Sequence, residues 1–364
     1  GYTRFTRIAD FAARCASAAG KSTNIEQVLV ERRFGGNGPL MAGALGRLGA
    51  RVTFAGAVGE LPAVGLGAGE QLSGSAPATS AATSAAAASP LPVHPVFQPF
   101  ARRCERVIAL GPPSTTDCLE FDDGKLMFNN TAAVQAVTWE RVRRVVGDET
   151  LRDMVASARL IAVVNWSLLG GVPGIWRGIG EVLRAYARTA PPEWRAPSIF
   201  VDLSDPAKRT DADVDQCLRD LVALNEHAPV TLGLNLAEGE RIARVAGLSV
   251  LDGAPPDCPG SRVRAAAELL RATLNLACVV IHPRHGSAAA TRERSAWVSG
   301  PYTARPKLST GAGDHFNAGF SLARALGLEL EHALATGNGV SGAYVRDAES
   351  PTFERLLAFL RAGV

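Results

Sequence analysis

The sequence lacks long apolar runs, paired cysteines and a large excess of charge, and each absence excludes a class of protein. No apolar segment approaches the roughly 18–20 residues that a membrane-spanning helix needs. The six cysteines form no CxxC pair, which argues against a zinc knuckle or disulfide framework and favours reduced thiols in a cytoplasmic protein. The net charge is only +3, so we expect neither nucleic acid nor an acidic membrane as a partner.

One segment differs in composition from the rest of the 364-residue chain. Residues 62–92 consist mainly of Ala, Ser, Thr, Gly and Pro, and contain few large apolar side chains. Such a segment cannot bury enough apolar surface to offset its loss of conformational entropy on ordering. The part of the chain before it is too short to form its own core. We therefore predict a disordered surface insertion within a single domain that spans residues 1–364.

Beyond this segment, short apolar runs alternate with segments of helical periodicity. The apolar runs, which predict buried strands, are residues 160–165, 198–202, 230–235 and 277–282. The segments with helical periodicity are residues 138–146, 213–225, 237–246, 262–274, 314–326, 330–346 and 352–361. Buried strands that alternate with amphipathic helices indicate an α/β fold with a mostly parallel sheet covered on both faces. Residues 115–128 instead predict a β-hairpin that turns at Asp123-Gly124.

The segment from Ser309 to Phe320 carries the most specific chemical signal. Its glycines, Gly311 and Gly313, precede a predicted helix whose first N–H groups have no partner within the helix. Such a helix N-terminus suits a phosphate group. Asp314 beside that phosphate can accept the proton of an attacking alcohol. In the simpler interpretation, Asp314 is a helix N-cap and the glycines form a tight turn.

Two further segments are less specific. Gly35, Gly36 and Asn37 form a glycine-rich turn before a helix of small residues; the turn suits close approach of a hydroxylated ligand, whereas the helix could simply pack closely on a sheet. Asn235 and Glu238 follow a predicted strand, where they could organise a metal and phosphates. The same spacing is typical of a capping box at a helix N-terminus.

In this order, the three segments resemble the signatures of the PfkB (ribokinase-like) carbohydrate kinase family. The Gly-Gly-Asn signature matches residues 35–48, the N-x-x-E motif matches residues 235–238, and the G-A-G-D-x-F signature matches residues 311–316. The resemblance covers about residue 20 to the end of the sequence. It implies a three-layer sandwich with a central sheet and a small β lid that includes the hairpin. It also implies transfer of phosphate from ATP, with Mg²⁺, to a hydroxyl of a sugar or a related polyol or nucleoside.

The resemblance also implies roles for individual residues. Asp314 would be the catalytic base, and Gly35, Gly36 and Asn37 would contact the sugar. The anion hole would consist of the amides of Gly311, Ala312 and Gly313. The residues on the nucleotide side would be Asn235, Glu238, His282, Gly286 and Asn338, with Glu238 reaching Mg²⁺ through water.

Two departures from the family pattern support an alternative function. The opening strand of the family, with its substrate-binding Asp, has no counterpart in this sequence, so we expect a central strand to be missing. Leu308 stands where the family usually has a polar residue. The alternative is a catalytically impaired relative that binds a small molecule as a regulator.

A nicotinamide-dependent oxidoreductase is disfavoured because no early strand is followed by GxGxxG. A homodimer through the lid is the assembly we consider.

Overall fold

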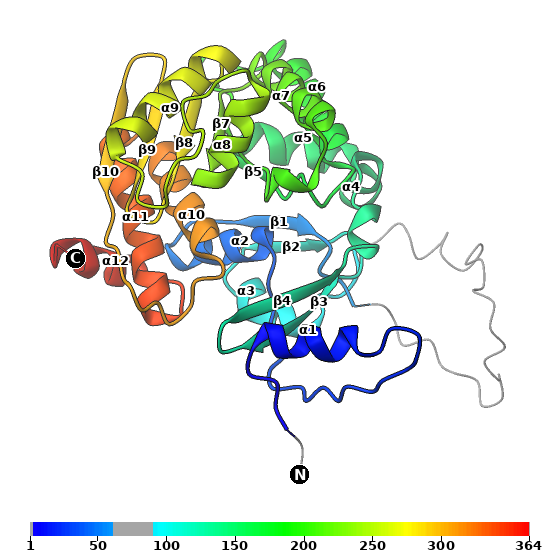
Figure 1. Ribbon diagram of the computed structural model, residues 1–364. Helices are drawn as coiled ribbons and strands as arrows, with labels where there is room; N and C mark the ends of the chain where they lie inside the picture. Colours follow the sequence, from blue (N-terminus) through cyan, green and yellow to red (C-terminus); the bar gives the residue numbers. More distant parts are fainter. Residues whose placement is uncertain (1–2, 61–89, 364) are drawn as a thin grey trace, which may run out of the picture.

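The computed structural model describes residues 3–60 and 90–363, and its centre is a six-stranded sheet (Figure 1). The strand order is β10-β9-β8-β7-β6-β5. These strands are β5 (Leu160–Val164), β6 (Ser198–Asp202), β7 (Val230–Leu234), β8 (Cys278–Ile281), β9 (Gly286–Thr291) and β10 (Ser295–Ser299). Strands β5 to β8 are parallel, whereas β9 is antiparallel to both β8 and β10. The predicted mostly parallel sheet is confirmed, with an antiparallel edge.

Helices cover both faces of this sheet, as predicted. The helices on one face are α2 (Asn37–Arg47), α10 (Ala312–Ala325) and α11 (Leu330–Asp347), and α12 (Phe353–Arg361) packs on α11. The helices on the other side are α4 (Trp139–Val146), α5 (Asp148–Ser157), α6 (Val172–Ala187), α7 (Asp211–Asn225), α8 (Leu236–Val245) and α9 (Gly260–Leu274). The result is a three-layer α/β sandwich.

Alternation along the strands divides the core into two layers. In β6, Ile199 and Val201 belong to the layer under α6–α9, whereas Phe200 belongs to the layer under α10 and α11. In β8, Val279 and Val280 separate in the same way. Successive side chains of a strand point to opposite faces, so a strand buried on both sides must be apolar throughout. This is why these strands are recognisable as uninterrupted apolar runs.

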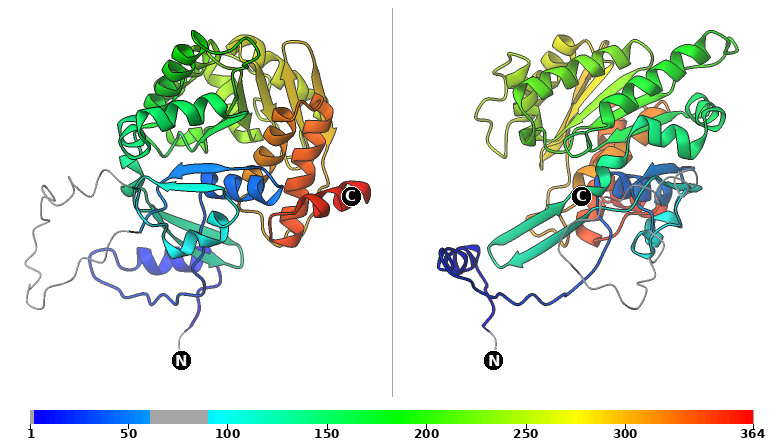
Figure 2. Two further views of the ribbon diagram at one scale, coloured as in Figure 1. Left: turned by 180° about the vertical axis from the view of Figure 1, so that it is seen from behind. Right: turned by 90° about the vertical axis from the view of Figure 1, so that its right-hand side faces the viewer.

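Two smaller sheets lie beside the main one (Figure 2). One pairs β1 (Thr53–Gly56) with β2 (Arg106–Ala109) in parallel, and α3 (Gln98–Ala101) lies against α2 nearby. The other is the predicted hairpin, in which β3 (Thr115–Phe121) pairs with β4 (Gly124–Asn130). The helix α1 (Ile8–Ala16) contacts the hairpin turn. There the amide of Ile8 donates to Asp123 Oδ1 at 3.0 Å, and the rings of Phe11 and Phe121 lie 5.5 Å apart.

Three short 3₁₀ helices complete the described elements: Pro95–Phe97, Ala133–Ala136 and Pro206–Lys208. Most of the predicted insertion, residues 62–89, lies outside the described residues. At its end, Leu91 forms an antiparallel bridge with Ala109 of β2, so this end is held against a strand. Among the described residues, no helix combines the length and the apolar character required to cross a membrane.

The packing of α6 on α4 gives a prediction for stability. A Cβ atom added at Gly178 of α6 would overlap the indole ring of Trp139, whereas one added at Gly174 would lie 4.0 Å from the Cβ of Trp139. We expect Gly178→Ala to lower the free energy of unfolding by about 1–3 kcal/mol through overpacking. Gly174→Ala is the matched control and should be neutral or stabilising, because Ala favours helix. Urea unfolding measures both, and an equal effect of the two variants would contradict the packing argument.

Candidate active site

The three predicted segments converge at the carboxyl ends of the parallel strands. Asp202 is the last residue of β6, Asn235 follows β7 directly, and His282 follows β8 directly. In open α/β sheets this edge is where ligands bind, because the strand-to-helix connections leave a crevice there. The N-termini of α8 and α10 also carry the predicted site residues Asn235 and Gly311.

The N-terminus of α10 has the geometry of an anion site. Gly311 is the N-cap, with a φ of +92° that favours glycine. In the described part of the chain, the amides of Gly311 and Gly313 have no hydrogen-bond acceptor, whereas that of Ala312 donates to the Ser309 carbonyl at 3.2 Å. Two of the three predicted anion-hole amides are therefore free to bind a ligand. The interpretation of Asp314 as the N-cap is wrong, because Asp314 lies inside the first turn of the helix.

The glycine-rich turn before α2 meets Asp314 directly. Asn37 Nδ2 donates a hydrogen bond to Asp314 Oδ1 at 3.0 Å, across 277 residues of sequence. Gly36, the N-cap of α2, has a φ of +92°, and Gly35 and Gly36 are both exposed just before the helix. The structure thus brings the predicted substrate-binding turn and the predicted base into contact.

Three carboxyl groups influence one another at this edge of the sheet. Burial raises the pKa of Asp314 well above its ordinary value; Asp202 adds to this shift, and the Asn37 hydrogen bond opposes it. Burial, and then the charge of Asp202, raise the pKa of Glu238 to about 7. Burial likewise raises the pKa of Asp202. Raised carboxyl pKa values of this kind are concentrated at functional sites.

The capping-box interpretation of Asn235 and Glu238 is confirmed. The Glu238 amide donates to Asn235 Oδ1 at 3.0 Å, and the Asn235 amide donates to Glu238 Oε2 at 2.8 Å. The other carboxylate oxygen, Oε1, accepts from the Asp205 amide at 3.1 Å. These bonds hold the Glu238 carboxylate in one orientation at the end of β7. Capping and ligand binding are compatible, since each carboxylate oxygen has a second lone pair.

Asp202 and its neighbours were missed by the sequence interpretation. Asp202 Oδ2 accepts from Asn317 Nδ2 at 2.7 Å, and its Oδ1 accepts from the Ser204 amide at 2.8 Å. The side-chain oxygens of Asn165 and Asn317 are buried without a hydrogen-bond partner. Asn165 and Ser204 also adopt φ values of +72° and +57°, which are strained for residues other than glycine. The sequence offered one signal for Asp202: it is an acidic residue at the end of a predicted apolar strand.

The predicted nucleotide-side residues divide into two groups. His282 lies beside the anion site, because its Cε1 would be 3.4 Å from a Cβ added at Gly313. Burial lowers the pKa of His282 to about 4, so the imidazole is neutral near pH 7. Asn338 has internal partners: its Oδ1 accepts from the Ser287 hydroxyl at 2.9 Å and its Nδ2 donates to the Val298 carbonyl at 3.1 Å. A Cβ at Gly286 would press against the same Val298 carbonyl.

The β3–β4 hairpin reaches the same region. Lys125 Nζ, in the hairpin turn region, donates to Thr310 Oγ1 at 2.6 Å, one residue before Gly311. Within residues 3–60 and 90–363, no group of three or more His, Cys, Asp or Glu side chains is arranged to hold a metal ion directly. A cation at this site would therefore depend on water molecules or ligand oxygens to complete its coordination.

Comparison with known proteins shows sequence relatives of this chain. Residues 87–362 match the family model of the prokaryotic ketohexokinases. The chain is 32% identical over 267 residues to a ketohexokinase of Haloferax volcanii. The aligned region covers 73% of this chain and 67% of that relative.

Solved structures support the same fold. Ribokinase from Arabidopsis thaliana, complexed with ribose and ATP, matches with a TM-score of 0.61 at 15% identity, over 94% of this chain and 91% of that chain. Adenosine kinase from Sinorhizobium meliloti matches with a TM-score of 0.60 at 16% identity, over 98% and 88% of the two chains.

Proposed function

The chain belongs to the prokaryotic ketohexokinase family of PfkB carbohydrate kinases, and we propose that it transfers the γ-phosphoryl group of ATP to a hydroxyl of a ketohexose or a closely related sugar. The observation that carries this proposal is the 3.0 Å hydrogen bond between Asn37 and Asp314. It brings a proton acceptor, a polar group suited to sugar hydroxyls and an anion-binding helix N-terminus to one place.

The proposed reaction follows from the chemistry of these groups. The Asp314 carboxylate accepts the proton of the sugar hydroxyl as its oxygen forms a bond to the γ-phosphorus, and the bond from that phosphorus to the bridging oxygen of ADP breaks. The raised pKa of Asp314 makes it a stronger base than an exposed carboxylate. The free amides of Gly311 and Gly313 would stabilise the negative charge on the transferred group.

The donors at the strand edge fit a magnesium ion held through water. The Glu238 carboxylate and the unpartnered amide oxygens of Asn165 and Asn317 are oxygen donors of the kind that Mg²⁺ prefers. When bound, Mg²⁺ would neutralise phosphate charge. The β3–β4 hairpin, through Lys125, would help to exclude water from the site. The exposed Met127 and Phe128 of β4 are apolar surface that a homodimer through the lid would cover.

A sugar panel tests the proposed function. ADP release is measured with fructose and other ketohexoses, with glucose, ribose and adenosine, each in the presence of ATP and Mg²⁺. We expect the highest kcat/KM with a ketohexose. ADP release with none of these acceptors would reject the kinase proposal, and a preference for adenosine would reject the sugar as acceptor.

One observation favours the alternative of a non-catalytic binding protein. Asp314 is only 8% exposed, and its raised pKa favours the neutral acid, which cannot accept a proton. Isothermal titration calorimetry with the same sugars separates the two functions. Sugar binding without ADP release above background would favour a regulatory protein over a kinase.

The raised pKa of Glu238 predicts how stability depends on pH. The pKa of Glu238 is about 7 in the folded protein and 4.5 when unperturbed. As pH rises, the Glu238 carboxyl therefore loses its proton in the unfolded chain before it does so in the folded protein. Stability should therefore fall between about pH 4.5 and pH 7 and level off above pH 7. We expect Glu238→Gln to reduce this slope, because the amide does not titrate. Thermal unfolding of both proteins between pH 5 and pH 8 measures how stability depends on pH.

The control for this measurement is Glu149→Gln, which changes an exposed glutamate of α5. It should leave the pH dependence unchanged. A Glu238→Gln variant with the same slope as the unmodified protein would show that Glu238 ionises normally in the folded state.

A further inference from the structure

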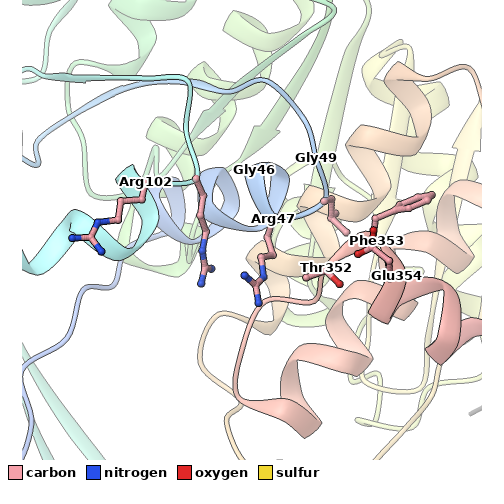
Figure 3. A pocket seen from close by; sticks show the side chains of 9 residues that line it. Gly46, Arg47, Gly49, Arg102, Thr352, Phe353 and Glu354 are labelled. Atoms are coloured by element: carbon pink, nitrogen blue, oxygen red, sulfur yellow. The ribbon is translucent and has the colours of Figure 1, made fainter.

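A cavity of about 440 Å³ lies at the opposite end of α2 from Asn37 (Figure 3). It is lined by the end of α2, the segment after α3 and the start of α12. The lining residues are Gly46, Arg47, Leu48, Gly49, Arg102, Arg103, Thr352, Phe353 and Glu354. Its volume falls in the range of small-molecule sites, and none of its residues belongs to the candidate active site.

Two arginines of this cavity share one carboxylate oxygen. Arg47 lies 2.8 Å and Arg103 lies 3.7 Å from Glu349 Oε1. The two guanidinium groups are held near each other because α2 packs closely on the segment after α3; a Cβ at Gly46 would overlap the Arg103 carbonyl. Burial and the nearby charge of Arg47 lower the pKa of Arg103, while Glu349 opposes this shift. One carboxylate therefore leaves positive charge uncompensated between the two arginines.

Unused hydrogen-bond donors accompany this charge. Arg47 Nε is buried and has no hydrogen-bond partner. On the other wall, Thr352 caps α12 by accepting from the Arg355 amide at 3.1 Å. The Glu354 carboxylate accepts from its own amide and from the Thr352 hydroxyl. The amide of Phe353 precedes the first intrahelical bond of α12 and remains available to an anion.

Simple compensation of a helix dipole accounts for only part of this arrangement. Arg47 lies in the last turn of α2, where a cation is favoured by the helix dipole. Arg103 follows the C-terminus of the one-turn helix α3, and the nearby charge of Arg47 lowers its pKa, so placing the two arginines close together has an electrostatic cost. Arg102 extends away from Arg47, and Glu354 is the acidic residue of the lining (Figure 3). Arg47 and Arg103 thus line the cavity, and Glu349, which is outside the lining, is their shared partner.

We propose that the cavity between Arg47, Arg103 and the start of α12 is a second anion site, which binds the phosphate group of a small phosphorylated metabolite. A phosphate dianion would replace Glu349 as the shared partner of the two guanidinium groups, whose planar donors match phosphate oxygens. Glu349 lies at the surface, with a side chain 59% exposed, and can move aside. The proposal does not depend on the sugar kinase reaction.

Binding measured by calorimetry tests this proposal. The full chain is first saturated with Mg²⁺ and a non-hydrolysable ATP analogue, so that the active site is occupied. It is then titrated with inorganic phosphate and, separately, with fructose 1-phosphate and fructose 6-phosphate. We expect saturable binding that Arg103→Gln or Arg47→Gln weakens about ten- to a hundredfold, through loss of a charge-assisted hydrogen bond. Equal affinity for all three probes would show that the site recognises the phosphate group alone. Tighter binding of one of the sugar phosphates would show that the site also contacts the sugar.

Two further variants keep the result interpretable. Arg51→Gln removes an exposed arginine outside the cavity and should bind as the unmodified protein does. Glu349→Gln removes the competing carboxylate and should tighten binding several-fold, even if the arginine variants fold poorly. No binding by the unmodified protein, or no change in any of the Arg47, Arg103 and Glu349 variants, would overturn the proposal.

Discussion

Asp314→Asn is expected to lower kcat by about 10²–10⁴-fold, which is the usual contribution of a positioned general base. Asparagine keeps the shape of the side chain but cannot accept the proton of the sugar hydroxyl. Binding of ATP should change little. ADP release gives the activity, and calorimetry gives the affinity for the nucleotide.

The stability of the same variant separates loss of the base from loss of the fold. The raised pKa of Asp314 means that ionising it in the folded protein is unfavourable, so a neutral side chain should maintain or raise the melting temperature. The matched control is Asp153→Asn, an exposed position on α5 on the far side of the sheet, which should remain fully active. Full activity of Asp314→Asn would show that another group accepts the proton.

Gly311→Ala is expected to reduce kcat by about 10²–10³-fold, comparable to the loss of one donor of an anion hole. The φ of +92° at Gly311 is unfavourable for alanine. The added Cβ would also lie 3.0 Å from Leu40 Cδ1 and 3.1 Å from the hydroxyl of Tyr344. Both effects displace the start of α10 and hence the amide that would face the phosphate. ADP release at saturating ATP and sugar measures the loss.

Gly327→Ala is the control for backbone strain alone. Gly327 has a φ of +81°, and a Cβ there would have no neighbour within 4 Å. It follows α10 on the exposed side, so this variant should lose stability but keep its activity. Equal losses of activity in the two variants would attribute the effect at Gly311 to general destabilisation rather than to the anion site.

The strands of the parallel sheet could be predicted because their signal is local. Strands β5 to β8 are short apolar runs, and burial on both faces requires that pattern. Strand β9, Gly286–Thr291, was missed because it contains Gly, Ser and Ala, which have little intrinsic preference for a strand. It is a strand because it pairs with β8 and β10, and its small residues allow α9 and α11 to pack closely.

The roles of the residues in the functional segments could be predicted only in part from the spacing of those residues in the sequence. Asn235 and Glu238 fitted both a capping box and a ligand site, and the structure confirms the capping box while leaving the ligand role a proposal. Asp314 fitted an N-cap, but Gly311 takes that position because it can adopt a positive φ. Asp202 carried no recognisable motif, and its place is evident only from its hydrogen bond with Asn317 and its effect on the pKa values of Asp314 and Glu238.

The amino-acid sequence by itself determined the alternation of the parallel strands with their helices, the turn chemistry of the glycine-rich segments and the family to which they point. Each of these depends on residues close together in the chain. The tertiary structure alone decided that Asn37 reaches Asp314, that three carboxyl groups perturb one another, and that Arg47 and Arg103 share Glu349. Those properties depend on distance and burial, which arise only when segments hundreds of residues apart pack against the same sheet.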